Sequence, residues 1–301
     1  MGGEPITRIA DLIAKFLISR LNIRYHPQGD SLFTYSRSRG YYRETDTLYD
    51  IKREGNISHH DLLRVSGGLP IPSSEEIIQC LKEKAPLLEI TPGVINFRNG
   101  ILDLRSGRFR AHSPDIVTTH QLPCYYIPSV KGGRLVEKVR MTFDPDTLNV
   151  LKGITRSAII SGPVDPMCSL LIVSPRMVSL IEGLWFRWLD RLLPRFMFLP
   201  EEIFRGRSGI GWRPFVCTNW VLSLKTKRIR RYLMPLAKRI TPTTFVLITE
   251  SQPRRAIKSW KRSGWRICDL RRRMDIPRWQ SIDINAVKKW EVSAFINYIL
   301  S

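Results

Sequence analysis

The chain has 301 residues and 43% apolar content, enough for one large or two small domains with hydrophobic cores. Its net charge of +21 is extreme for this length and favours polyanionic partners, with nucleic acid ahead of an anionic membrane. The five cysteines contain no Cys-x-x-Cys pair, which excludes a zinc knuckle and argues against a disulfide framework.

The first ninety or so residues predict a mixture of helices and short strands. Residues 6–21 carry apolar residues at helical spacing, and charged residues interrupt the run, so it indicates a helix rather than a signal peptide. Residues 22–44 alternate between apolar and polar positions, which predicts two short strands around turns. Residues 70–86 predict a helix that Ser73 or Ser74 caps and Pro86 ends.

A run of short strands follows in "GVINFRNGILDLRSGRFRAHSP", residues 93–114, with turns at "RNG" and "RSG". Eight of its residues fall in a recognisable order and spacing: Asn96, Asn99, Gly100, Asp103, Leu104, Gly107, His112 and Pro114. An ordinary hairpin could share the turns but not the whole series. The segment resembles the N-terminal domain of phage, plasmid and poxvirus-type primase-helicases, and the resemblance covers roughly residues 10–128.

That resemblance implies a helicase core of superfamily 3, a hexameric ring ATPase, after the N-terminal domain. From about residue 131 a glycine-containing boundary and a helical piece at 144–154 are followed by apolar runs at 196–199, 215–218 and 245–249, which predict buried strands. We therefore expect an α/β protein. An α+β domain (1–128) would precede a degenerate P-loop/AAA+-like three-layer α/β domain (129–280) and a C-terminal helix (281–301).

The stretch "IISGPVDPMCSLL", residues 159–171, lies where the resemblance implies a phosphate loop of the form G-x-x-x-x-G-K-[ST]. An apolar, strand-like run leads to Gly162, and Ser169 follows at the required spacing. Met167 and Cys168 replace the second glycine and the lysine, and Cys168 supplies no positive charge. Three neighbouring residues also oppose phosphate binding. Pro163 and Pro166 lack a backbone N–H donor, and Asp165 adds a negative charge. The sequence predicts a degenerate loop with little affinity for nucleotide.

The other signatures that the resemblance implies are incomplete as well. The sensor asparagine is replaced by Glu250 if "PTTFVLITESQP" is the sensor strand, or is Asn219 if "CTNW" is. Glu201 and Glu202, the nearest acidic pair, are interpreted as the solvated start of a helix. We assign no catalytic or metal-binding residue and expect no cofactor. ATP and Mg²⁺ would be expected only if the loop still binds nucleotide.

The last third of the chain is strongly basic, since residues 201–301 hold 22 Lys and Arg against 7 Asp and Glu. The segment 253–263 predicts an amphipathic helix with a cationic stripe, and tryptophans are interleaved with the arginines after it. Cations track phosphates and aromatic rings stack on unpaired bases. The predicted nucleic-acid-binding residues are Lys225, Lys227, Arg228, Arg230, Arg231, Arg254, Arg255, Lys258, Lys261, Arg262, Arg266, Arg271, Arg272 and Arg273.

The leading hypothesis is a nucleic-acid-binding, replication-associated protein of a virus or plasmid that derives from a primase-helicase and lacks a working ATPase. It would bind DNA in preference to RNA in the cytoplasm of the host cell. It would act together with an active helicase or polymerase, or form a homo-oligomer. One alternative is an active ATP-dependent helicase in which Arg156 or Arg176 replaces the lysine. Another is a basic protein that binds a membrane surface or an acidic partner through the helix at 253–263.

Overall fold

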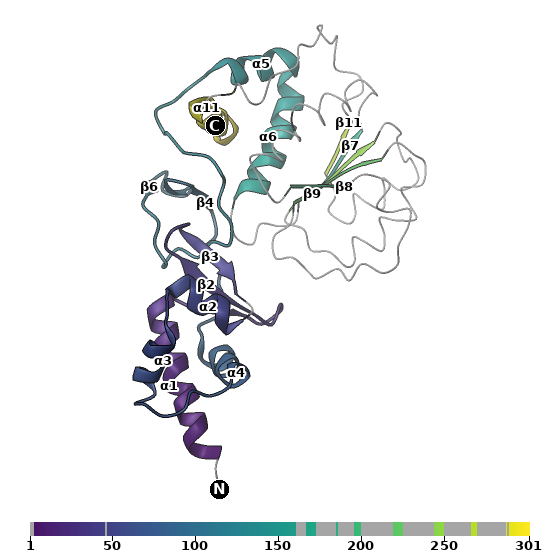
Figure 1. The fold of residues 1–301 in the computed structure, drawn as a ribbon. Coiled ribbons are helices and arrows are strands. Elements are labelled where there is room, and N and C mark those ends of the chain that lie inside the picture. Colours follow the sequence, from purple (N-terminus) through teal and green to yellow (C-terminus); the bar gives the residue numbers. More distant parts are fainter. Residues whose placement is uncertain are drawn as a thin grey trace. The chain divides into compact units, whose positions relative to one another are not determined.

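The structure, a computed structural model, describes residues 3–45, 47–160, 167–172, 185, 196–199, 219–224, 244–249, 266–269, 287 and 289–301 (Figure 1). The chain divides into two compact units. The N-terminal unit comprises Met1–Asn96 and Gly100–Gln121, and the C-terminal unit comprises Phe97–Asn99 and Leu122–Ser301. The division after Gln121 lies a few residues before the boundary expected at residue 128. None of the helices in the described ranges has the length and apolar character needed to cross a bilayer.

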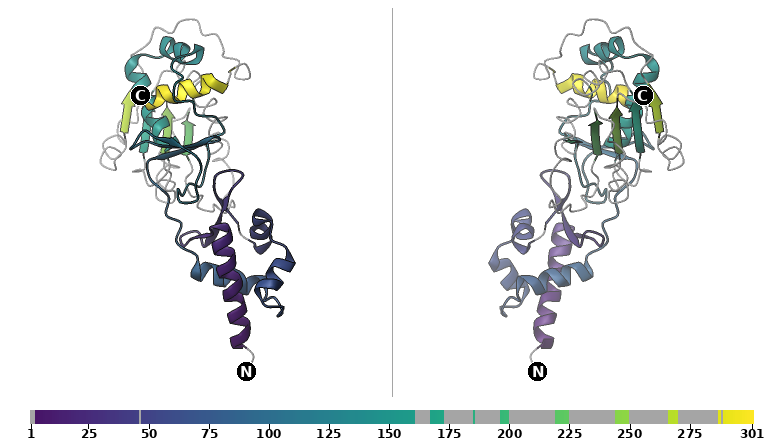
Figure 2. Two further views of the ribbon diagram at one scale, coloured as in Figure 1. Left: turned by 90° about the vertical axis from the view of Figure 1, so that its left-hand side faces the viewer. Right: turned by 90° about the vertical axis from the view of Figure 1, so that its right-hand side faces the viewer.

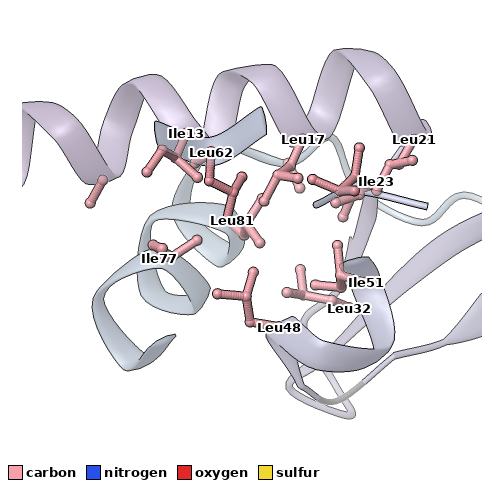
Figure 3. Packing of buried hydrophobic residues seen from close by; sticks show 14 of the residues in the cluster. Ile13, Leu17, Leu21, Ile23, Leu32, Leu48, Ile51, Leu62, Ile77 and Leu81 are labelled. Atoms are coloured by element: carbon pink, nitrogen blue, oxygen red, sulfur yellow. The ribbon is translucent and has the colours of Figure 1, made fainter. Parts of the chain in front are cut away.

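Four helices of the N-terminal unit enclose one apolar core. They are α1 (Gly3–Leu21), α2 (Leu48–Gly55), α3 (His59–Val65) and α4 (Ser74–Lys84). One face of α1 carries Ile13, Leu17 and Leu21, and these side chains join Ile77 and Leu81 of α4 in a single buried cluster (Figure 3). The helix expected at residues 6–21 is therefore confirmed, and its apolar spacing is the spacing of the buried face.

Side-chain caps set the starts of the three shorter helices. Ser73 accepts a hydrogen bond from the Glu76 N–H, and the Glu76 carboxylate accepts one from the Ser73 N–H, so α4 begins with the expected cap. Ser58 and Asp61 form the same reciprocal pair at α3. Thr47 caps α2 by accepting from the Asp50 N–H.

Two small antiparallel sheets complete the N-terminal unit and give it an α+β arrangement. The first has the strand order β1 (Arg24–His26), β2 (Ser31–Ser36), β3 (Tyr41–Glu44), and the second has the order β4 (Val94–Phe97), β5 (Gly100–Asp103), β6 (Phe109–Arg110). The strands expected at 93–114 are thus present, with turns at the two predicted glycine-containing positions. The region 22–44 holds three strands where the sequence predicts two.

The described helices of the C-terminal unit are α5 (Arg134–Thr142), α6 (Pro145–Ile159) and α11 (Lys289–Leu300). Helix α11, near the end of the chain, packs against α5 and α6, and both views of Figure 2 show it beside them. Trp185 is buried among them. Its Nε1 donates to Thr155 Oγ1 at 2.9 Å, and its ring meets those of Phe143 and Phe295 edge to face.

Polar contacts fix α11 to the chain that precedes α5. The Ile127 N–H donates to Ser293 Oγ at 2.7 Å, and Asn297 Nδ2 donates to the carbonyl oxygens of Ile127 (3.0 Å) and Val130 (2.9 Å). The Glu291 side chain is 2% exposed and pairs with Arg134 at 3.3 Å. The C-terminal helix expected at 281–301 therefore belongs to the C-terminal unit rather than standing apart.

A five-stranded parallel sheet forms the rest of the described C-terminal unit. Its strands are β7 (Met167–Ile172), β8 (Phe196–Leu199), β9 (Asn219–Leu224), β10 (Thr244–Thr249) and β11 (Arg266–Asp269), in the order β11-β7-β10-β9-β8. The strands expected at 196–199 and 245–249 are confirmed. The strand expected at 215–218 lies outside the described residues, and β9 begins immediately after it.

The structure corrects the expected order of elements around residues 159–171. Residue Ile159 ends helix α6, and Ile160 is its C-cap, so no strand leads into this stretch. The residues expected in the loop, Met167, Cys168 and Ser169, lie instead at the start of β7. A phosphate loop needs the order strand, loop, helix. The order here is helix, then strand, because the apolar run before Gly162 continues the buried side of α6.

We expect Ser293→Ala to destabilise the C-terminal unit by about 1–3 kcal/mol, because the Ile127 N–H would lose its acceptor in a part-buried position. All 8 tryptophans of the chain lie between residues 185 and 290, so denaturant unfolding followed by tryptophan fluorescence reports on this unit. Ser301→Ala is the matched control, since the exposed Ser301 hydroxyl donates to the Tyr298 carbonyl oxygen in the last turn of the neighbouring α11. Equal losses in the two variants would contradict the role given to Ser293.

Candidate functional site at the carboxyl edge of the parallel sheet

Four strands of the parallel sheet end at the same level. Ile172 of β7 is in register with Thr249 of β10 on one side and with Asp269 of β11 on the other, and Thr249 is in register with Leu224 of β9. The residues that leave these strands therefore start from one edge of the sheet. Asp269 is exposed there. This edge collects the ends of segments that are far apart in the sequence.

The strand order distinguishes the carboxyl ends of the neighbouring strands β7 and β10 from the rest of this edge. From β7 the chain continues to β8 at one border of the sheet, whereas from β10 it continues to β11 at the opposite border. Parallel sheets bind ligands outside the carboxyl ends of neighbouring strands whose connections leave in opposite directions. The topology therefore favours the carboxyl ends of β7 and β10 as a ligand site.

The residues expected in a phosphate loop do not reach this edge. Met167, Cys168 and Ser169 occupy the first half of β7, and Gly162 lies outside the described residues. Ser169 precedes the end of β7 by three residues, which is about 10 Å along a strand. The segment that leaves the carboxyl end of β7 instead begins at residue 173, which also lies outside the described residues.

The two sensor assignments separate clearly in the structure. Asn219 is the first residue of β9 and is in register with Phe196 and Thr244, at the amino edge of the sheet. The amino and carboxyl edges are about 17 Å apart along a six-residue strand. Asn219 therefore lies away from the carboxyl edge, and its assignment as a sensor stays a prediction. Glu250 lies outside the described residues, but it directly follows Thr249 at the carboxyl end of β10.

Sequence reasoning missed Asp269. This carboxylate closes β11, beside the end of β7, and the sequence predicted no strand there. The β11 strand has only four residues, too few for a clear apolar run, and arginines surround it. The register with β7 gives Asp269 its position, and no local pattern could have indicated it.

One of the predicted nucleic-acid-binding residues falls on a described element. Arg266 is the first residue of β11 and is in register with Ser169, so it lies toward the amino edge of the sheet. The others, at 225–231, 254–262 and 271–273, lie outside the described residues. The cationic helix expected at 253–263 also lies there.

In the N-terminal unit, the motif residue Asn96 forms the centre of a buried hydrogen-bond network. Its side chain is fully buried, and its Nδ2 donates to the Gly40 carbonyl oxygen at 2.8 Å and to Thr118 Oγ1 at 2.7 Å. Its Oδ1 accepts from His112 Nε2 at 3.1 Å and from Gln121 Nε2 at 3.2 Å. The Gln121 amide also donates to the Arg39 carbonyl oxygen. These contacts hold the β2–β3 turn against the segment that carries His112.

Two further motif residues shape turns. Asp103 accepts hydrogen bonds from the N–H groups of Arg105 and Ser106. The pKa of its carboxyl is lowered first by a hydrogen bond from the Ser106 side chain and then by these backbone bonds. In the C-terminal unit, Asn99 and Tyr126 exchange two hydrogen bonds of 2.9 Å through the Asn99 amide and the Tyr126 backbone. Within the described residues there is no group of three His, Cys, Asp or Glu side chains that could hold a metal ion. The motif thus has an evident structural role.

Part of the chain is similar to a known protein family. Residues 74–193 match the family described as "D5 N terminal like", the N-terminal domain of primase-helicase proteins. The match supports the resemblance at residues 93–128 and extends it through α5, α6 and β7. Residues 10–73 lie outside it. A comparison with curated proteins finds no match.

We expect Gly40→Ala to destabilise the N-terminal unit by about 2–4 kcal/mol, because Gly40 has φ +72° and a Cβ there would overlap the His112 ring. Gly67→Ala is the matched control: its φ is +68°, but a Cβ would meet nothing within 4 Å, so only the backbone cost of about 1–2 kcal/mol applies. Amide hydrogen exchange in residues 8–121 measures both. Equal protection in the two variants would show that the close approach to His112 has no energetic weight.

Proposed function

We propose that this chain is a replication-associated nucleic-acid-binding protein, related to primase-helicases, whose C-terminal unit lacks a working ATPase site. The match of residues 74–193 to the N-terminal domain of primase-helicase proteins carries the proposal. Such a protein acts on replicating DNA of a virus or plasmid, beside an active helicase or polymerase or as an assembly of identical chains.

The parallel sheet supports a nucleotide-binding ancestry. In chain order its strands number one to five, and the first strand, β7, lies between the fifth and the fourth. Proteins with phosphate loops place the loop directly after a strand, at the carboxyl edge of such a sheet. By this argument the ancestral loop would follow Ile172 rather than precede Met167.

The residues that follow β7 support the loss of ATPase activity. They read "VSPRMVSL", residues 173–180, and contain neither glycine nor lysine. A phosphate loop requires glycines for close approach of the backbone to the phosphates and a lysine for the β and γ oxygens. Pro175 also removes a backbone N–H donor. The conclusion drawn from residues 162–169 therefore also applies to residues 173–180.

An active ATPase is the second candidate, and the acidic residues at the carboxyl edge favour it. Asp269 ends the strand on one side of β7, and Glu250 follows the strand on the other side. Carboxylates are the groups by which proteins hold Mg²⁺ beside phosphates. Arg176 would be the cation that replaces the missing lysine.

The proposed function predicts salt-dependent binding to single-stranded DNA. With about six phosphate contacts, the slope of log affinity against log salt concentration is expected to be about −4 for a single strand. Fluorescence anisotropy of a labelled oligothymidylate measures it. Replacing Arg271, Arg272 and Arg273 by glutamine should weaken binding at least tenfold, whereas the same change at Arg8, Arg20 and Arg105, exposed arginines of the N-terminal unit, should have a smaller effect. A wild-type chain that does not bind the oligonucleotide would refute the function.

The absence of ATPase activity is tested separately by phosphate release, with and without single-stranded DNA. We expect turnover at the level of the buffer control, because no lysine is available for the β and γ phosphates. DNA-stimulated hydrolysis that Arg176→Ala or Asp269→Asn abolishes would establish the second candidate instead.

A further inference from the structure

Two cationic side chains of the C-terminal unit lie over the ring of one tyrosine, and a third cation, Arg156, lies near one of them. Arg140 lies in the last turn of α5, Lys152 and Arg156 lie one turn apart on α6, and Tyr298 lies near the end of α11. The Arg140 guanidinium is 4.7 Å and the Lys152 ammonium 4.4 Å from the centre of the Tyr298 ring. These four residues are called the Tyr298 cluster.

The cluster is rigidly assembled, because the helix that carries Tyr298 is held by hydrogen bonds. Asn297, the preceding residue, donates to the carbonyl oxygens of Ile127 and Val130, and Ser293 bonds to Ile127 one turn earlier. Helices α5 and α6 flank α11 (Figure 1). The cations therefore come from two helices whose positions against Tyr298 are set by the fold.

Within the part of the chain that the structure describes, the cations of the cluster, Arg140, Lys152 and Arg156, form no ion pair. Lys152 is half-buried, and its pKa is lowered by that burial first and then by the charges of Arg140 and Arg156. A contact between a cation and the ring stabilises by about 0.5–1 kcal/mol at an exposed site, and Arg140 and Lys152 each form one. The charges of Arg140 and Arg156 also repel Lys152, and an anion bound among the three cations would offset that repulsion.

We propose that the Tyr298 cluster, whose residues lie outside the basic sequence segments 225–273, binds phosphate groups of the nucleic-acid backbone. This inference rests on the proposed function and assigns it a place in the fold. Arginine forks and a lysine ammonium donate several charge-assisted hydrogen bonds to phosphate oxygens. Arg140 and Arg156 are exposed, which suits a phosphate that remains part of a long strand better than one enclosed in a pocket.

The test compares two double variants of the full chain that lose the same charge. Arg140→Gln/Arg156→Gln removes two exposed cations of the cluster, and Lys131→Gln/Arg98→Gln removes two exposed cations elsewhere in the same unit. Binding to a labelled oligothymidylate of about 20 nucleotides is measured over a range of salt concentrations. We expect the cluster variant to bind about tenfold more weakly and its salt slope to fall by about 1.4, from two lost phosphate contacts. The control variant should change both quantities far less.

Arg156→Gln alone separates a binding role from a structural one, because Arg156 contacts no aromatic ring among the residues that the structure describes. The variant should lower the salt slope by about 0.7 while its thermal midpoint stays the same or rises, since repulsion on Lys152 is relieved. A lower midpoint with unchanged DNA affinity would overturn the proposal in favour of a structural role. Equal effects of the two double variants on DNA binding would also overturn it, while binding by the wild-type chain would leave the proposed function standing.

Titration with labelled ATP under the same conditions identifies the source of the phosphate. Unchanged ATP affinity in the cluster variant, together with weaker oligonucleotide binding, supports a backbone site. Loss of ATP binding with unchanged oligonucleotide binding would refute the backbone assignment and point to a free nucleotide.

Discussion

The N-terminal unit depends on the burial of a single amide. Asn96 is fully buried, and both its nitrogen and its oxygen form two hydrogen bonds, so the cost of removing a polar group from water is offset at every position. A half-satisfied amide would cost about 1–3 kcal/mol instead. Its partners come from the β2–β3 turn and from the chain after β6, so the network fixes segments that no strand pairing joins directly. Gly40 is required where His112 closes over that turn.

The first and last hundred residues of the chain differ strongly in net charge. Residues 1–100 contain 13 Lys and Arg against 12 Asp and Glu, and their cations commonly have acidic partners, as Lys84 has in Asp11. In the C-terminal unit, Arg140 and Lys152 of the Tyr298 cluster contact an aromatic ring instead. Uncompensated positive charge destabilises a folded unit slightly by repulsion. Its retention beside a rigid helix is understandable if polyanions complete the charge balance.

The predictions from sequence succeeded where the signal is local. The apolar spacing of residues 9–21, the cap at Ser73 and the glycine turns of 93–114 each depend on neighbours within a few residues, and all are present. Helices α2 and α3 were not expected, because each has under three turns and too few apolar residues to show a period. The run before Gly162 was assigned to a strand because a short apolar segment does not distinguish a buried helix end from a strand.

The sequence by itself determined the kind of N-terminal domain, the excess of charge in the last third and the lack of a lysine or glycine pattern for phosphate binding. These are properties of residue type and order. Only the tertiary structure decided that Asn219 and Ser169 lie away from the carboxyl edge, that Asp269 reaches it and that Arg140 and Lys152 meet at Tyr298. Strand register and helix packing set those positions, and both join residues more than 20 positions apart, so no local pattern encodes them.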